Sequence, residues 1–204
     1  MKNILITVVV VATLFGVYWF FLTPEKNTSY EDQITLYRHQ RAEFYRNSAE
    51  SPFIAQKVPF TYLDYFEINR AFKIKAGFES YNPQKKLALA TSTGTFDTLM
   101  IIGEATFNWD DQSQTLLVLG SGTSNDDLFI PFQDATSGKT SYGGGRYLEV
   151  QSPDGSSIIL DFNKCYNPYC AYTDGYTCPF PPKENRLDIP IEAGEKIYPG
   201  HTNN

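Results

Sequence analysis

The feature that most constrains this chain is the two-residue period of its apolar side chains beyond residue 72. The stretch 72–78 reads FKIKAGF, and short apolar runs follow at 87–89, 99–102, 116–119, 128–130, 147–150 and 158–160. Turn-forming residues separate these runs, at 82–83, 109–111, 120–122, 137–138 and 153–155. Many short strands at this spacing predict a mainly β fold, an antiparallel barrel or sandwich. A doubly wound α/β fold is not expected, because no long helical pattern separates the runs.

One amphipathic helix should precede the strands. Ser29 and Asp32 have the spacing of a capping box at the start of a helix. Side chains then recur at helical intervals up to about Asn47, and the recurring set is Tyr30, Ile34, Tyr37, Arg41, Phe44 and Tyr45. Ser51-Pro52 should end the helix, because a residue that precedes proline disfavours helical backbone.

The first part of the chain contains an uncharged apolar run from Ile4 to Leu22. As a helix this run would be about 28 Å long, close to the thickness of a bilayer hydrocarbon core. A cleaved signal peptide has a shorter apolar region and a small-x-small cleavage site, which residues 20–24 do not offer. We therefore expect an uncleaved single transmembrane helix.

The charges flanking this run give its orientation. Lys2 is the basic residue on the N-terminal side, so the N-terminus should stay in the cytoplasm. This arrangement predicts two parts: a membrane anchor at 1–24 and an extracytoplasmic β-rich domain at 25–204. The domain would then lie in the periplasm or outside the cell.

The acidic balance of the chain argues against one class of partner. The net charge is -6, and the sequence contains no cluster of Lys and Arg. Phosphate contacts supply most of the affinity of nucleic-acid binders, so nucleic acid is not an expected partner.

Region 129–195 differs from the rest because its polar residues stand among aromatic residues, glycines and prolines without alternating. Polar groups buried at such density must bind one another or a ligand. The candidate ligand-binding residues are Asp134, Tyr142, Arg146, Asp161, Asn163 and Asn167. In one interpretation they line a cavity that solvent reaches, and Arg146 is unpaired or singly paired. In the other they form a closed network that pins long loops to the strands, and Arg146 is fully paired with Asp134 or Asp161.

Motifs in this region carry a resemblance to a known family. They are FIPFxD at 129–134, YGGGRYL at 142–148, DFN at 161–163, YNPxCAY at 166–172, CPxPPxxNxL at 178–187 and AGE at 193–195. With them, about residues 35–198 resemble the bacterial and archaeal family called domain of unknown function 1684. The resemblance implies no activity, since the family is named for lacking one. The family usually carries Ala where this chain has Cys165.

Each polar feature also has a simple structural explanation. Residues 143–145 could hold a phosphate, but they run into a strand where a helix would be needed, which favours a tight turn. Asp161, Asn163 and Asn167 could bind a hard cation, although turn chemistry explains them better. Asp161 and Glu184 could form an acid/base pair only if the fold brings them together.

Two of the three cysteines should pair in an oxidising compartment. Because the resemblance marks Cys165 as a departure, the expected disulfide joins Cys170 and Cys178. Family members without export signals keep the two positions, so buried thiols or ligands remain the alternative. A three-thiolate metal site is not expected, because the spacing is unlike that of zinc ribbons or fingers and no histidine lies nearby.

The scarcity of histidine lowers the expectation of several enzyme classes. The chain has two, His39 and His201, and neither lies in region 129–195. No HExxH, P-loop, dinucleotide fingerprint or nucleophile elbow is present, and no metal or cofactor is expected.

Three functions remain. The leading one is a membrane-tethered binding module for a small organic molecule, a glycan or a peptide, because aromatics with few polar groups suit such ligands. The second is a cell-envelope enzyme that uses carboxylate and Asn chemistry. The third is a structural subunit whose helix at 29–47 docks on a membrane protein partner.

Overall fold

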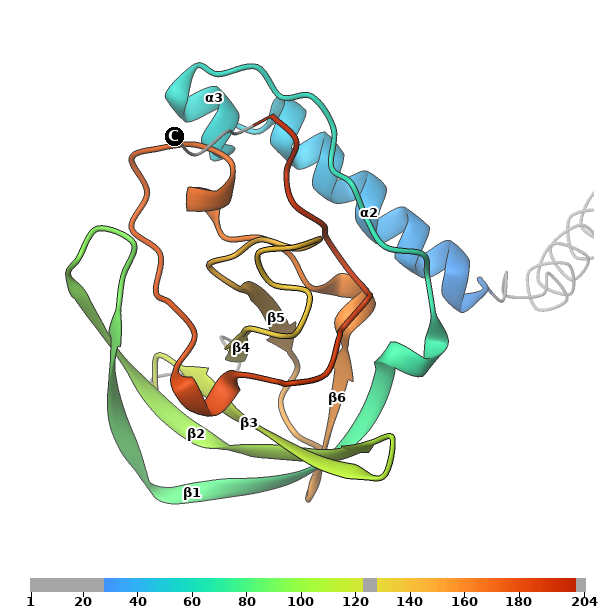
Figure 1. The fold of residues 1–204 in the computed structure, drawn as a ribbon, viewed down its shortest axis with the longest axis vertical. Helices are drawn as coiled ribbons and strands as arrows, with labels where there is room; N and C mark the ends of the chain where they lie inside the picture. Colours follow the sequence, from blue (N-terminus) through green and yellow to red (C-terminus); the bar gives the residue numbers. More distant parts are fainter. Residues whose placement is uncertain (1–27, 123–127, 201–204) are drawn as a thin grey trace, which may run out of the picture. The chain divides into compact units, whose positions relative to one another are not determined.

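The computed structural model describes residues 28–122 and 128–200 (Figure 1). The expected anchor at 1–24 lies outside these ranges. Within them, no helix has both the length and the apolar character needed to cross a membrane. The helices are α2 (Tyr30–Asn47) and α3 (Pro52–Gln56), with the short 3-10 helices η1 (Arg70–Phe72), η2 (Phe162–Lys164), η3 (Tyr169–Ala171) and η4 (Lys183–Asn185).

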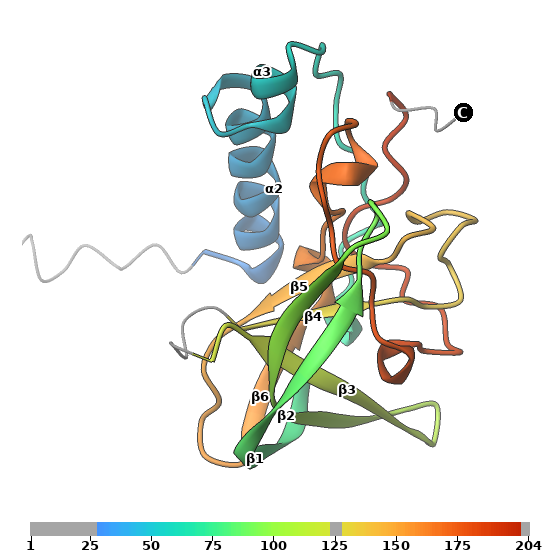
Figure 2. The ribbon, with the colours of Figure 1, turned by 90° about the vertical axis from the view of Figure 1, so that its left-hand side faces the viewer.

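The strands form one antiparallel sheet that curves into a half-barrel (Figures 1 and 2). Its order is β5-β4-β3-β2-β1-β6. The strands are β1 (Lys73–Ala90), β2 (Phe96–Trp109), β3 (Gln112–Gly120), β4 (Leu128–Phe132), β5 (Arg146–Val150) and β6 (Ser157–Asp161). The prediction of a mainly β, antiparallel domain with one N-terminal helix is confirmed.

Two of the expected turns have different outcomes. At 109–111 the chain does turn: Asp110 and Asp111 have φ of 47° and 61°, the left-handed pair that joins twisted strands in a tight hairpin. At Asn82-Pro83 the expected turn is wrong. Strand β1 continues through it and shifts register between Ser80 and Lys85, an irregularity that tolerates the missing proline N–H.

Helix α2 begins as the sequence indicates. The Asp32 amide donates to Ser29 Oγ at 3.1 Å, and the Ser29 amide donates to Asp32 Oδ2 at 3.3 Å. These reciprocal bonds form the capping box. The helix ends at Asn47, and Ser51 then caps α3 by accepting a hydrogen bond from the Phe53 amide.

Three hydrophobic clusters hold the domain together. The largest fills the concave side of the sheet, where Leu116, Ile130 and Leu160 are fully buried. A small one consists of buried residues from β1, β2 and β3, namely Leu89, Ile101, Leu117 and Leu119. The remaining cluster is an aromatic core, and its buried residues are Tyr45, Phe53, Tyr172 and Tyr198. Tyr45 comes from α2, so this core packs residues 34–47 of the helix onto the long loops of the C-terminal part.

The C-terminal segment beyond η4 crosses the opening of the half-barrel and then runs beside α2 (Figure 1). Its backbone is irregular, so its carbonyl and amide groups need partners from elsewhere. Some of those partners are backbone groups, such as the carbonyls of Asp64 and Cys165, and others are polar side chains of region 129–195.

Candidate functional site

Arg146 lies at the start of β5 and has no exposure to solvent. Its Nη2 donates to Asp134 Oδ1 at 3.3 Å and to the Ile191 carbonyl at 2.8 Å. Its Nη1 donates to the carbonyls of Ala193 and Glu195, the latter at 3.1 Å. Arg146 therefore joins the backbone of the C-terminal segment to Asp134 in one hydrogen-bond network, while its buried Nε has no hydrogen-bond partner among the described residues.

Asp134 completes this network from the other side. Its carboxylate accepts hydrogen bonds from the Thr136 hydroxyl and from the Ile191 amide, the latter at 2.7 Å. It is 6% exposed, and its charge is balanced by Arg146. A buried charge with several donors around it costs little, because every lone pair has a partner.

Three buried asparagines act as substitutes for strand partners. The Asn163 amide group bonds both the N–H and the C=O of Asn69, at 2.9 and 2.8 Å. Asn185 bonds the N–H and the C=O of Leu117 and also the Pro131 carbonyl, so it bridges β3 and β4. Asn167 Nδ2 donates to the Lys196 carbonyl at 2.8 Å. These amides satisfy backbone groups that have no partner in a neighbouring strand.

The candidate acid/base pair lies in two different settings. Asp161 ends β6 and is 8% exposed, next to Asn163. Glu184 is exposed in η4, where Lys183 lies beside it. The structure gives this pair no shared surface in which to act on a substrate.

Gly145 makes the turn that the sequence suggests at 143–145. Its φ is +92°, and an added Cβ would come within 2.7 Å of the Phe132 carbonyl oxygen. Only glycine fits there. The chain enters β5 directly after it, so the segment is a tight turn before a strand.

The disulfide expected between Cys170 and Cys178 is wrong, because all three cysteines are free thiols. The Cys170 amide instead donates to Cys178 Sγ at 3.3 Å. A hydrogen bond from the Cys178 side chain lowers the pKa of Cys170 to about 7, helped by Tyr142 and Ser92. Tyr142 Oη lies 3.9 Å from Cys170 Sγ. Burial raises the pKa of Cys165 to about 11.

A second buried ion pair joins Glu195 to Arg41 of α2. Glu195 Oε1 accepts from Arg41 Nε at 3.3 Å, and Oε2 accepts from the Asn167 amide at 3.0 Å and from the Tyr172 hydroxyl. The Glu195 side chain is 1% exposed. Burial alone would lower the pKa of Arg41, but Glu195 and nearby tyrosines raise it well above its ordinary value.

One nitrogen of the Arg41 guanidinium group, Nη1, is not engaged in a hydrogen bond within the described residues. Nε bonds Glu195 and Nη2 bonds the Tyr45 hydroxyl at 2.6 Å, whereas Nη1 makes no hydrogen bond within residues 28–122 and 128–200. The guanidinium carbon lies 4.2 Å from the centroid of the Tyr166 ring. The Arg41 group is thus held in place, with donors left for another molecule.

Arg41 lines a cavity of about 300 Å³ between α2 and the loops after β5. A second cavity of about 1020 Å³ shares Tyr147, Glu149 and Tyr166 with it. We call the two together the tyrosine groove. The other aromatic residues that line it are Tyr37, Phe44, Tyr45, Phe129, Tyr169 and Tyr176. Its size and aromatic lining are those of pockets that bind small organic molecules.

The tyrosines of the groove are fixed by hydrogen bonds. The Tyr166 backbone pairs with that of Tyr147 on the edge strand β5, at 2.8 and 3.0 Å. The Tyr166 hydroxyl donates to Glu149 Oε1 at 2.8 Å, and the Tyr147 hydroxyl donates to the Pro179 carbonyl at 2.6 Å. These contacts orient the rings in advance of any ligand, which lowers the cost of binding.

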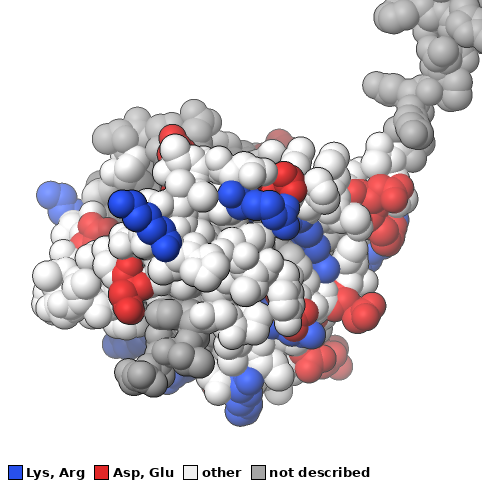
Figure 3. Space-filling model, turned by 90° about the horizontal axis from the view of Figure 1, so that it is seen from above, with Lys and Arg blue, Asp and Glu red and all other residues white. Residues whose placement is uncertain are grey.

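The charge on the surface is mixed. On the face seen from above, Lys and Arg alternate with Asp and Glu among uncharged residues (Figure 3). That face presents no broad basic area.

None of the six candidates from the sequence lines the groove cavities. Arg146 and Asp134 are brought together, as are Asp161 and Asn163, whereas Tyr142 lies with Cys170. Sequence reasoning missed Arg41, Glu149 and Glu195. The signal for Arg41 was a charged residue in the aromatic stripe of the helix.

Comparison with known proteins agrees with this description of the fold. A family model described as "Protein of unknown function (DUF1684)" matches residues 58–196. The solution NMR structure of an uncharacterized protein from Haloarcula marismortui is similar, with a TM-score of 0.65 and 31% identity. That likeness covers 84% of this chain and 96% of the other. No curated protein matches the chain.

Proposed function

This chain belongs to the family described as Protein of unknown function (DUF1684), and we propose that it is a membrane-tethered binding module whose tyrosine groove holds a glycan segment. The proposal places the groove outside the cytoplasm. Its tether is the apolar run from Ile4 to Leu22, with Lys2 on the cytoplasmic side.

The observation that carries the proposal is the unused Nη1 of Arg41 in an aromatic cavity of about 300 Å³. Glu195 neutralises Arg41, so the cavity does not demand an anion. Its second charged group, Glu149, is exposed and offers acceptors. Donors and acceptors set among flat rings match the two kinds of surface on a sugar, its hydroxyl rim and its apolar C–H face.

The third function considered from the sequence has less support. Between residues 34 and 47 of α2, Ile34 and Tyr45 are buried inside the domain. Arg41 likewise points its charge to Glu195 of the same domain. The apolar face of the helix therefore packs against its own domain, and a smaller surface of the helix is left for contact with a membrane protein partner.

Titration of the full-length protein in detergent micelles tests the proposal. The probes are a panel of soluble oligosaccharides and a panel of short peptides. At least one oligosaccharide should bind, and Tyr176→Ala on the groove wall should weaken it at least tenfold, as the loss of an aromatic anchor does. Tyr62→Ala is the matched control, because Tyr62 is 59% exposed and lines neither cavity of the groove.

The possible outcomes separate the parts of the proposal. Binding of peptides alone would replace the glycan assignment. Equal effects of the two substitutions would remove the groove as the site. The tether is tested separately by the intact mass of the protein from membranes, which should include residues 2–22. A mature N-terminus after Leu22 would contradict it.

A further inference from the structure

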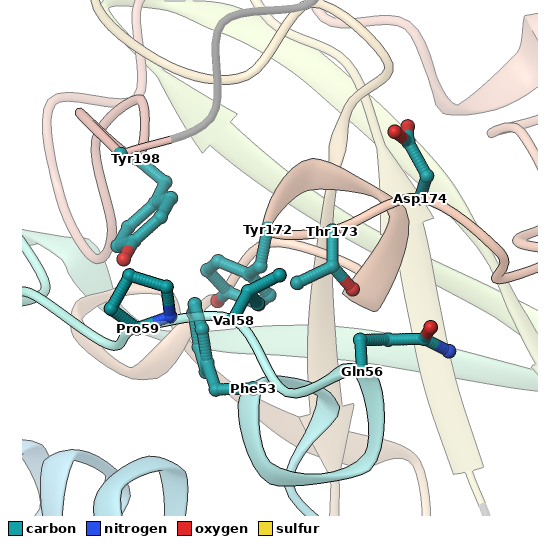
Figure 4. Close-up of a pocket in the computed structure, with 9 residues that line it drawn as sticks. Phe53, Gln56, Val58, Pro59, Tyr172, Thr173, Asp174 and Tyr198 are labelled. Carbon is teal, nitrogen blue, oxygen red and sulfur yellow. The ribbon is translucent and has the colours of Figure 1, made fainter.

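A third cavity, distinct from the two that form the tyrosine groove, lies on the other side of the aromatic core. It has a volume of about 310 Å³ and is formed by α3, the chain just after it, the loop after η3 and the C-terminal segment (Figure 4). Its innermost residues are buried, namely Phe53, Tyr172, Thr173 and Tyr198. Gln56 and Asp174 are exposed at its mouth. We call it the Thr173 cavity.

One wall of the cavity is made of three aromatic rings. The centroids of Phe53, Tyr172 and Tyr198 lie 5.4 to 5.7 Å apart in every pairing. The two tyrosine hydroxyls are engaged elsewhere. That of Tyr172 donates to Glu195, and that of Tyr198 accepts from the Thr61 amide at 3.1 Å. The wall therefore offers the cavity an apolar surface.

Thr173 supplies the polar group. Its side-chain oxygen is buried and has no hydrogen-bond partner in the described part of the chain, although the residue is only 4% exposed. A buried hydroxyl without a partner costs about 1–3 kcal/mol. In Figure 4 its side chain lies beside Tyr172, with Gln56 and Asp174 on either side of it. Such an orphan group next to a cavity calls for a partner from outside the chain.

We propose that the Thr173 cavity binds a small uncharged aromatic compound that carries a hydroxyl group. The ring lies against the three-ring wall, and the hydroxyl bonds to Thr173 Oγ1. Asp174 at the mouth disfavours a carboxylate or phosphate, because like charges repel. A cation is also disfavoured, because the four buried residues at the inner end of the cavity carry no carboxylate to balance its charge.

The proposal is tested with phenol as the probe and the full-length chain in detergent micelles. Amide chemical shifts of residues 172–175 should move and saturate, and benzoate should leave them in place. Thr173→Val keeps the shape and removes the orphan hydroxyl, so it should fold at least as well as the parent. It should weaken phenol binding about fivefold, the effect of one lost hydrogen bond.

Two further variants complete the design. Thr173→Ser keeps the hydroxyl and should keep the affinity for phenol within about twofold of the parent. Thr177→Val is the matched control, since Thr177 is exposed on the tyrosine groove and should leave phenol binding unchanged. Phenol affinity that is equal in Thr173→Val and the parent would overturn the proposal, as would equal binding of benzoate. Neither result affects the glycan experiment, which measures oligosaccharide binding to the tyrosine groove.

Discussion

Arg146 and Asp134 form an ion pair in which neither side chain has any exposure to solvent, with Nη2 and Oδ1 3.3 Å apart. The other hydrogen bonds of Arg146 go from Nη1 and Nη2 to three carbonyls of the C-terminal segment. The pair thus connects the turn after β4, the start of β5 and the chain that crosses the half-barrel. Removal of the pair should therefore lower the free energy of unfolding.

Arg146→Met is expected to lower the free energy of unfolding by about 3–5 kcal/mol, because it leaves Asp134 as a buried charge without its partner. Urea denaturation monitored by circular dichroism measures this change. Arg186→Met is the control, since Arg186 is exposed and bonds the side chain of Gln133. A loss below 1 kcal/mol for Arg146→Met would show that the network is not what holds the segment.

Asn185→Ala should also destabilise the domain, by about 1–3 kcal/mol for each backbone group of Leu117 that loses its partner. Amide hydrogen exchange gives the local view: the Leu117 amide should exchange much faster in the variant. Asn108, which is exposed in β2, serves as the control position for Asn→Ala. Unchanged exchange at Leu117 would contradict the bridging role of Asn185.

Cys170 should react with iodoacetamide as a thiolate near neutral pH. Its pKa is lowered to about 7, so the rate of alkylation should rise through pH 7 and level off above it. Cys165 is fully buried with a pKa of about 11 and should stay unmodified in the folded protein. Peptide mapping after brief labelling measures the two.

The substitution Tyr142→Phe tests the cause of that low pKa. It removes one hydrogen bond that favours the Cys170 thiolate, so the midpoint of the alkylation profile should move to higher pH. Tyr62→Phe should leave the midpoint where it is. A profile for Tyr142→Phe that overlays the parent would remove Tyr142 from the explanation.

The half-buried Tyr37 predicts an alkaline limit to stability. Burial raises the pKa of Tyr37 to about 12, against about 10 in an unfolded chain. The stability that this difference supplies is complete below pH 10 and is lost as pH rises through 12. The urea midpoint should therefore fall between pH 9 and pH 11.5. Tyr37→Phe should make that fall shallower, and an identical fall in the variant would contradict the assignment.

The sequence was informative where structure is local. Alternation of side chains predicted the strands, and the Ser29–Asp32 spacing predicted the helix start. It was less informative about the groove. Arg41 and Glu195 are 154 residues apart in the chain. Outside the groove, three of the partners of Arg146 are backbone carbonyls, which leave no signal in the side-chain pattern. Pro83 led to the wrong prediction of a turn. A proline can also be accommodated at a register shift within a strand, as it is between Ser80 and Lys85 of β1.

Three asparagine amides stand in for backbone at places where this fold has no strand to offer, at Asn163, Asn167 and Asn185. Asparagine is also a side chain that hydrolyses slowly in water, losing ammonia and becoming a carboxylic acid. At each of these positions that reaction would put a carboxylate oxygen where an N–H had faced a carbonyl oxygen. The lifetime of the folded domain therefore depends on the rate of this hydrolysis as well as on the free energy of unfolding. Burial of the three amides limits their contact with water and so slows the hydrolysis.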